Sequence, residues 1–326
     1  MKKYRAALIG CGRIGSEFDK QIPKKQAFSH AGAYSLCPMT ELVAAADVDA
    51  KKRGRFSRKW KVSSVYADYN KMFRSEKIDI LSVATPPSTH WPVIKEACRY
   101  PLKAIYCEKP ISESVADAKK IVASCRKNKI LLVVNHQRRF GAFYQELKNK
   151  LRNGKLGRVQ QVTCYYARGV VNTCTHLIDL FIFLFGEVKS IDAKLSKNTS
   201  PFSDDPNLDG TLSFKNGLDL SLKACDDRAF LILEIDILTT KARVRIGEKL
   251  EYYEARPGKN LLKRKELVPS KAPFAAKYPR YGMVPLNCGV ERIVRCLDGK
   301  EKPLSTGENA MQALSVIQAM LKEIRS

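Results

Sequence analysis

Three glycines near the start of the chain have the spacing of a phosphate-binding turn. Gly10, Gly12 and Gly15 follow a short apolar run at residues 6–9 and form the pattern G-x-G-x-x-G. The first glycine permits a tight turn off a strand, the second lets the backbone approach a pyrophosphate, and the third lets the next helix pack closely on the sheet. Amides at the start of that helix would bind the phosphates. The pattern predicts a dinucleotide-binding βαβ unit.

Asp47 ends the second predicted strand, where a carboxylate can accept hydrogen bonds from the adenosine ribose. It lies 32 residues after Gly15, further than the usual spacing of about 20, and a loop predicted at residues 17–28 accounts for the difference. A carboxylate there repels a 2′-phosphate and favours NAD, although Lys51 and Arg53 could accommodate NADP. The alternative role for Asp47 is to cap the next helix.

Two further strand ends carry polar residues. The strand predicted at residues 78–84 runs into a loop that contains Thr85, Pro86 and His90, and the strand at 103–107 runs into Glu108 and Lys109. Ligands of a parallel sheet lie beyond the carboxyl ends of its strands. The lysine could orient the nicotinamide, hydrogen-bond a reacting hydroxyl or stabilise its alkoxide. The alternative is an ion pair between Glu108 and Lys109 at a strand end.

His176 lies in the first turn of a very apolar helix predicted at residues 175–185, where a side chain can face a cleft. Asp179, three residues later, shares its face and could hold the imidazole. The alternative is a histidine satisfied within the core. Arg139 falls where the first helix of the second domain approaches the ligand crevice, and it is either a substrate ligand or a surface arginine.

These residues are positioned by two different patterns of elements. Strands and helices alternate over residues 1–135, which predicts a doubly wound parallel sheet of the Rossmann type, covered on both faces. Over residues 136–326 the pattern is α+β, with helices at 141–153 and 175–185 and short strands between 189 and 254 that predict a mostly antiparallel, open sheet. The stretch 255–285 is predicted to be a surface loop, and two helices follow it. The fold class is therefore α/β with two domains.

The composition narrows the range of partners. The chain has 326 residues and a net charge of +25, with its lysines and arginines spread along the whole length. This favours an anionic small molecule over nucleic acid, which would concentrate the charge on one element. No apolar run is long enough to span a membrane and no signal-peptide core is present, so we expect a cytoplasmic protein. The ten cysteines form no C-x-x-C pair, which favours reduced thiols and no metal site.

The ordered set of motifs resembles the glucose–fructose oxidoreductase/inositol dehydrogenase/MocA (Gfo/Idh/MocA) family. The matching stretches are 8–15, 45–49, 84–90, 107–110, 154–159 and 176–179. The resemblance implies a Rossmann domain followed by an α/β domain whose open sheet mediates homodimers or homotetramers. It also implies an NAD(P)-dependent oxidoreductase that acts on a hydroxyl or carbonyl of a sugar, sugar acid or nucleotide-sugar.

By position, Lys109 corresponds to the family's catalytic lysine and His176 to its catalytic histidine. The family's acidic partner, four residues before the histidine, is replaced here by Asn172, whose amide can bind a hydroxyl but cannot take its proton. Our hypothesis is that His176 is the acid/base, that Lys109 polarises the reacting oxygen, and that Asn172 only positions substrate. The predicted cofactor ligands are Gly10, Gly12, Arg13, Ile14, Gly15, Asp47, Thr85, Pro86, His90, Glu108 and Lys109.

Two other activities fit the same motifs. Some proteins of this kind are glycosidases that use tightly held NAD for a transient oxidation with no net redox change. A non-catalytic dinucleotide-binding sensor or partner subunit is the other alternative, because Asn172 stands where a carboxylate is expected.

Overall fold

The computed structural model describes residues 3–258, 264–270 and 284–324 and divides into two compact units. Unit 1 comprises Met1–Phe140 and Val284–Leu314, and unit 2 comprises Gly141–Met283 and Ser315–Ser326. The boundary predicted after residue 135 assigns all later residues to the second domain. The structure differs from it, because residues 284–314 pack with the first unit.

Unit 1 is built on a six-stranded sheet in which every neighbouring pair is parallel. The strand order is β3-β2-β1-β4-β5-β6, so the direction of winding reverses between β1 and β4, and a ligand is expected beyond the carboxyl ends there. The strands are β1 (Tyr4–Ile9), β2 (Thr40–Ala46), β3 (Val65–Tyr66), β4 (Ile80–Val83), β5 (Ala104–Cys107) and β6 (Leu131–Val134). This confirms the predicted doubly wound parallel sheet.

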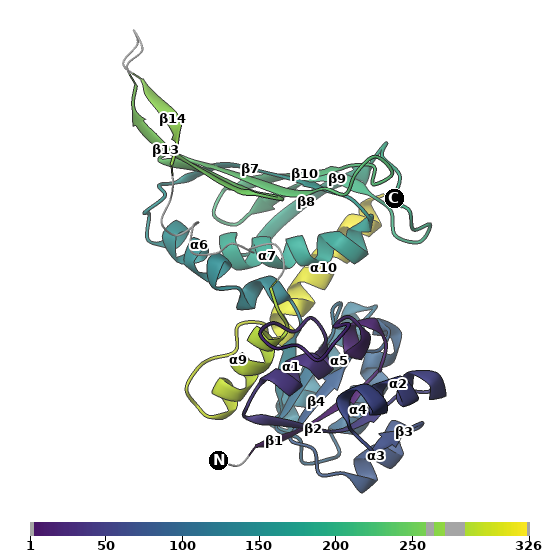
Figure 1. Ribbon diagram of the computed structural model, residues 1–326. Helices are drawn as coiled ribbons and strands as arrows, with labels where there is room; N and C mark the ends of the chain where they lie inside the picture. The colour runs from purple at the N-terminus through teal and green to yellow at the C-terminus, as the bar shows by residue number, and fades with distance from the viewer. Residues whose placement is uncertain (1–2, 259–263, 271–283, 325–326) are drawn as a thin grey trace. The chain divides into compact units, whose positions relative to one another are not determined.

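Helices cover both faces of this sheet, which explains why its inner strands β4 and β5 are buried along their whole length (Figure 1). Capping side chains fix where four of the helices begin, because each accepts a hydrogen bond from a backbone amide of the first turn. The caps are Ser29, Asp49, Asp68 and Ser114. The helices are α1 (His30–Leu36), α2 (Ala50–Trp60), α3 (Tyr69–Ser75), α4 (His90–Ala97) and α5 (Val115–Lys127).

The connection after the glycine turn contains only a short π-helical segment, η1 (Arg13–Glu17), before an irregular stretch that leads to α1. Asp19 holds the beginning of this irregular stretch against its end, because its buried carboxylate accepts hydrogen bonds from the amides of Phe28 and Ser29, both at 2.9 Å. The crossover helix is therefore α1, and the loop predicted at residues 17–28 lies before it.

The second stretch of unit 1, residues 284–314, begins beside α1. The Leu286 amide donates to the Ala27 carbonyl at 2.7 Å, and the Asn287 side chain accepts from the Ala27 amide at 3.1 Å. Helix α9 (Asn287–Leu297) follows, and α10 (Gly307–Glu323) places Ala310 and Leu314 in the main hydrophobic core of the unit. The first domain is therefore completed by residues from the far end of the chain.

Unit 2 is built on an eight-stranded sheet in which all pairs are antiparallel except β10 with β7. Helices α6 (Ala142–Arg152) and α7 (Thr175–Phe185) lie along one face of it (Figure 1). The strand order is β14-β13-β12-β11-β7-β10-β9-β8. The strands are β7 (Val159–Tyr166), β8 (Val188–Leu195), β9 (Leu208–Phe214), β10 (Asp219–Ala224), β11 (Leu233–Thr239), β12 (Ala242–Ile246), β13 (Leu250–Pro257) and β14 (Lys265–Pro269).

The prediction of a loop at residues 255–285 is wrong where it overlaps the end of β13 and the whole of β14. Strand β14 is an edge strand that exposes most of its residues, so it carries no alternation of apolar and polar side chains that would mark it as a strand. Residues 259–263 and 271–283 of the predicted loop lie outside the described residues.

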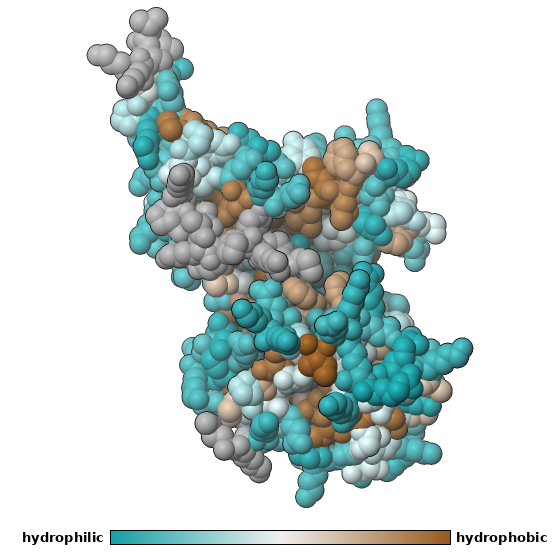
Figure 2. All heavy atoms as spheres, in the orientation of Figure 1, coloured by the Kyte–Doolittle hydropathy of each residue, from teal (hydrophilic) through white to brown (hydrophobic). Residues whose placement is uncertain are grey.

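Hydrophilic side chains cover most of the visible face of unit 1, and hydrophobic ones form smaller patches between them (Figure 2). Within the described residues, no helix combines the length and the apolar character needed to cross a bilayer.

Candidate functional site

The three glycines of the first turn have three different environments. Gly10 has φ +97°, and a Cβ there would lie 2.5 Å from the Ala84 carbonyl oxygen. A Cβ on Gly15 would collide with the carbonyl oxygen of Gly10. A Cβ on Gly12 would meet no protein atom within 4 Å. Gly10 and Gly15 are therefore required by the fold, whereas the space beside Gly12 is open for a ligand.

Asp47 ties this turn to the end of β2. Its Oδ2 accepts from the Cys11 amide at 2.7 Å, and its Oδ1 accepts from the Asp49 amide at 2.9 Å. The alternative reading of Asp47 as the cap of the next helix is wrong, because the cap of α2 is Asp49. The nearby Arg53 guanidinium donates to the carbonyl oxygens of Asp47 and Val48 at 2.7 and 3.1 Å.

A cavity of about 450 Å³ lies at the carboxyl ends of β1, β2 and β4. Five of the predicted cofactor ligands line it, namely Gly10, Gly12, Asp47, Thr85 and Pro86. Sequence reasoning missed Lys52, Ala67 and Tyr69 in the same lining, because β3 and α3, which bring the last two there, were not predicted. The cavity is mostly apolar with a few polar groups, as expected of a site for a nucleoside.

His90 is fully buried and supports this cavity without lining it. Its Nε2 lies 2.9 Å from the Thr85 carbonyl oxygen, and its Nδ1 lies 3.1 Å from that of Ile111 and 3.3 Å from the Cys107 sulfur. Burial lowers the pKa of His90, so the ring is neutral and donates through one nitrogen only. The buried histidine therefore holds the backbone of the loop that begins at Thr85 from the interior of the protein.

The predicted cofactor ligand Arg13 is exposed, and its guanidinium lies over the Phe18 ring at 4.9 Å.

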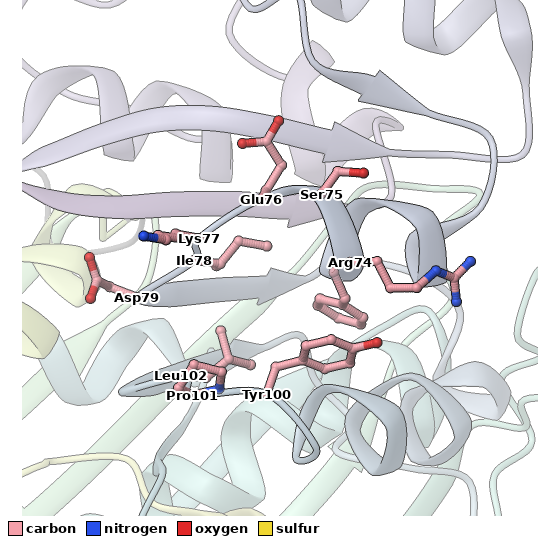
Figure 3. A pocket seen from close by; sticks show the side chains of 10 residues that line it. Arg74, Ser75, Glu76, Lys77, Ile78, Asp79, Tyr100, Pro101 and Leu102 are labelled. Atoms are coloured by element: carbon pink, nitrogen blue, oxygen red, sulfur yellow. The ribbon is translucent and has the colours of Figure 1, made fainter.

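A larger cavity of about 680 Å³ lies at the opposite end of the sheet. Tyr100, Pro101 and Leu102 line one side of it, and residues 76–79 line the other (Figure 3). Its carboxylates already have partners, because Glu76 accepts from Arg5 and Tyr66, and Asp79 pairs with Lys103. Despite its size we place no function there, since ligands of such sheets bind at the carboxyl ends of the strands.

Glu108 belongs to a buried polar cluster that the sequence did not reveal. Its Oε1 lies 2.8 Å from the Nε2 of His30 and accepts from the Asn135 amide group at 2.6 Å. His30 Nδ1 lies 2.8 Å from the hydroxyl of Ser82, which lies 2.7 Å from the hydroxyl of Tyr34. Glu108 therefore has His30 as a buried partner, which the predicted alternative of a Glu108–Lys109 ion pair did not include.

Burial raises the pKa of Glu108, but the hydrogen bonds and charge of His30, the Asn135 amide and the charge of Lys109 outweigh it and lower the pKa overall. Glu108 is therefore a carboxylate. The order Ser82, His30, Glu108 has the connectivity of a hydrolytic triad. Both Ser82 and His30 are fully buried, so no substrate can reach the hydroxyl. Lys109 follows directly and is half-exposed at the strand end.

In unit 2, His176 is the second residue of α7 and is half-buried. Asp179 is buried in the same helix. Asn172 is exposed, within the short π-helical segment η4 (Gly169–Cys174), and its Nδ2 lies 3.3 Å from the Arg168 carbonyl oxygen. The structure therefore places Asn172 and His176 in consecutive segments of one unit.

A carboxylate that the sequence did not indicate holds η4. Asp205 is buried and accepts from the amides of Val171 and Asn172 at 2.7 and 2.8 Å. Burial raises the pKa of Asp205, and these amides offset part of that effect. Gly169 has φ +83° and lies so close to Asp205 that a Cβ would collide with it.

Arg139 is 4% exposed in unit 1, so the alternative of a surface arginine is wrong. Its guanidinium donates to the Leu304 carbonyl oxygen at 3.3 Å. Within the described residues, no group of three or more His, Cys, Asp or Glu side chains could hold a metal ion.

Two family models match this chain. Residues 4–136 match the NAD-binding Rossmann fold of the GFO/IDH/MocA oxidoreductase family, and residues 169–326 match the C-terminal alpha/beta domain of the same family. The chain belongs to this oxidoreductase family. Its first unit is an NAD-binding Rossmann domain, and the open space beside Gly12 fits the approach of a pyrophosphate.

The chain is also similar to individual proteins. It is 24% identical to D-apiose dehydrogenase of Paraburkholderia graminis over 98% of this chain and 87% of that protein. It is 27% identical to myo-inositol 2-dehydrogenase of Thermotoga maritima, over 47% of this chain and 42% of that protein. The fold is shared with the WlbA dehydrogenase of Bordetella pertussis, solved with NADH and UDP-GlcNAcA, at a TM-score of 0.78 and 22% identity over 100% of this chain and 97% of that one.

Proposed function

We propose that the protein transfers a hydride between NAD and a hydroxyl or carbonyl carbon of a sugar, sugar acid or nucleotide-sugar. The observation that supports this most directly is the cavity at the carboxyl ends of the strands, with Gly12 open to it and Asp47 at its edge. The cofactor supplies a nicotinamide ring that accepts or releases the hydride. The carboxylate of Asp47 favours NAD over NADP.

The chain's own residues would hold the two substrates and move the proton. We propose that the glycine turn, with Arg13 and Ile14, contacts the pyrophosphate, and that Asp47 accepts from the ribose. Lys109 donates a hydrogen bond to the reacting oxygen, and His176 takes or returns its proton. The remaining proposed substrate ligands are Asn172, Arg139 and Asp179.

The names of the similar proteins support a carbohydrate substrate, since they include dehydrogenases of apiose and of inositol. The excess of 58 basic over 33 acidic residues favours one that carries negative charge. A nucleotide-sugar or sugar acid satisfies both conditions. We also propose a homodimer or homotetramer formed through the open sheet of unit 2, which sedimentation velocity would test.

The decisive experiment is NADH formation against a panel of sugars, sugar acids and nucleotide-sugars. We expect turnover with an anionic member of the panel, its loss in Lys109→Ala, and a fall of about 100-fold or more in His176→Ala. Lys103→Ala is the matched control, because Lys103 pairs with Asp79 at the amino end of the same strand.

Three outcomes would contradict the proposal. Turnover that survives His176→Ala but not Lys109→Ala would refute the division of roles. Cleavage of a glycoside without accumulation of NADH would show the NAD-using glycosidase activity. Binding of NADH without turnover of any member of the panel would indicate a sensor or partner subunit.

A further inference from the structure

The backbone that leads into the helix of His176 is held by a distant part of unit 2. Four consecutive amides, those of residues 169–172, each donate a hydrogen bond to residues 205–207, which form a clamp. Gly169 donates to the Asn207 side chain at 2.9 Å, and Val170 donates to the Pro206 carbonyl oxygen at 3.0 Å. The next two amides, as described above, donate to the two oxygens of the Asp205 carboxylate.

The clamp supplies what the start of η4 lacks. The first amides of a helical segment have no acceptor within the helix and need one from elsewhere. Arg168, the residue before η4, makes no capping hydrogen bond with its side chain. A carboxylate suits this place because its two oxygens can accept from two neighbouring amides at once. The clamp packs so closely that a Cβ on Gly169 would collide with Asp205.

The clamp is itself fixed to the sheet. Leu208, the first residue of β9, follows it directly. The Asn207 side chain donates to the carbonyl oxygens of Thr199 and Cys225, both at 3.1 Å. Both Asp205 and Asn207 are buried, so a substitution that removes their acceptors leaves buried amides unpaired. The clamp therefore transmits the position of the sheet to η4.

The segment η4 continues directly into α7, which begins at Thr175. Within this helix, all of which the structure describes, ten of the eleven residues are buried and His176 is half-buried. His176 follows Asn172 by four residues, about one turn of helix. The hydrophobic core fixes the later turns of α7, whereas the segment before its first turn depends on the clamp. A shift of η4 would therefore move both side chains.

We propose that Asp205 and Asn207 are positioning residues that hold Asn172 and His176 where the reaction requires them. Neither clamp residue touches the substrate in this scheme. The inference deepens the proposed function and rests on the roles given there to Asn172 and His176. Reacting groups have to be held closely, since a misplacement of about 1 Å can lower a rate about 100-fold.

The competing explanation is that the clamp only stabilises unit 2. Asn216→Ala is the control, because the Asn216 side chain donates to the Phe185 carbonyl oxygen at 3.0 Å and so holds the other end of the same helix. Asn207→Ala and Asn216→Ala thus each remove one asparagine side chain, the first near the start of the η4–α7 segment and the second at its end. If the clamp is only structural, His176 should respond alike to both.

The test needs no substrate. It measures how fast diethyl pyrocarbonate modifies His176 in the full-length protein, read by peptide mass spectrometry. We expect Asp205→Asn and Asn207→Ala each to raise this rate about fivefold or more, because unpaired amides let the segment before α7 open. Asn216→Ala should leave the rate within about twofold. The internal reference is the set of buried histidines, His30, His90 and His136.

Kinetics with a substrate found in the sugar panel supply a second measurement, made where urea denaturation shows each variant to be fully folded. We expect kcat to fall about tenfold or more in Asp205→Asn and Asn207→Ala, with a smaller rise in KM. In Asn216→Ala both constants should stay within about twofold. A clamp that only stabilises the fold would produce no such fall in fully folded protein.

A modification rate at His176 that is unchanged in both clamp variants overturns the proposal, and so does an equal rise in Asn216→Ala. If Asp205→Asn does not fold, Asn207→Ala alone decides the result. Failure of the sugar panel would refute the proposed function and leave the modification rates standing. Turnover with an unchanged kcat in both clamp variants would refute this inference alone.

Discussion

Replacing Gly12 with alanine should separate cofactor binding from folding. Gly12 has φ −75°, which alanine adopts without strain, and a Cβ there meets no protein atom within 4 Å. The free energy of unfolding should therefore change by less than about 0.5 kcal/mol. The same methyl group would occupy the space that the pyrophosphate needs. Overpacking of this kind costs about 1–3 kcal/mol, which corresponds to a Kd for NADH raised roughly 5- to 150-fold.

The neighbouring glycines supply the contrast. Gly10→Ala combines φ +97° with a Cβ that would lie 2.5 Å from a carbonyl oxygen, so we expect it to lower the free energy of unfolding by about 1–3 kcal/mol. Gly15→Ala should cost more, because its Cβ would lie even closer to a backbone carbonyl oxygen, that of Gly10, than the added Cβ of Gly10 would lie to that of Ala84. Urea denaturation of the protein without cofactor and fluorescence titration with NADH measure the two quantities separately.

The result that would refute this reasoning is a Gly12→Ala protein that binds NADH as tightly as the unaltered chain. The open space beside Gly12 would then not be the path of the pyrophosphate. A large loss of stability in Gly12→Ala would be equally damaging, because it would mean that the glycine is needed for the turn itself.

Other changes test the remaining parts of the site. Asp47→Ser should raise affinity for NADP relative to NAD by about tenfold or more, because it removes a charge that repels the 2′-phosphate; an unchanged ratio in fluorescence titrations would contradict this. The pKa of Glu108 lies below its ordinary value of 4.5, so Glu108 stabilises the fold above pH 4.5 and loses this effect as the pH falls through the lowered pKa. The difference in unfolding free energy between the unaltered chain and Glu108→Gln, about 1–3 kcal/mol at neutral pH, should therefore shrink under acid, as urea denaturation at several pH values would show. Asp205→Ala should cost about 1–3 kcal/mol, since the amides of Val171 and Asn172 lose their acceptor, and faster hydrogen exchange in η4 would report it. Among the ten cysteines only Cys225, Cys288 and Cys296 are more than marginally exposed, so iodoacetamide should label these three first in the native protein, as peptide mass spectrometry would reveal.

Much of unit 1 could be predicted from the sequence because its information is local. Buried parallel strands appear as apolar runs, and the turns at Gly10 and Asp47 follow them directly. The prediction missed Val65–Tyr66, because a strand of two residues has no periodicity to detect. It also missed β14, whose exposed residues bury no face.

The parts of the site that the sequence did not reveal depend on distant residues. His30 and Glu108 are separated by 78 positions, and Asn172 and Asp205 by 33. A histidine early in a short helix or an aspartate in a polar loop carries no local sign of its partner. Tertiary packing alone brings these groups together, so motif spacing could indicate Lys109 and Asn172 but not the residues that support them.

The return of residues 284–314 to the first unit has a consequence for the biosynthesis of this protein. A ribosome releases the six strands of the Rossmann sheet long before it makes Ala310 and Leu314, which complete the core of that sheet. The amino-terminal domain therefore cannot complete its hydrophobic core until residues 141–283, and the segment 284–314 after them, have emerged from the ribosome. Domains that are contiguous in sequence can fold one after another during synthesis. Here the nascent chain exposes an unfinished apolar surface until residues 284–314 have been made, which makes it a candidate client for chaperones.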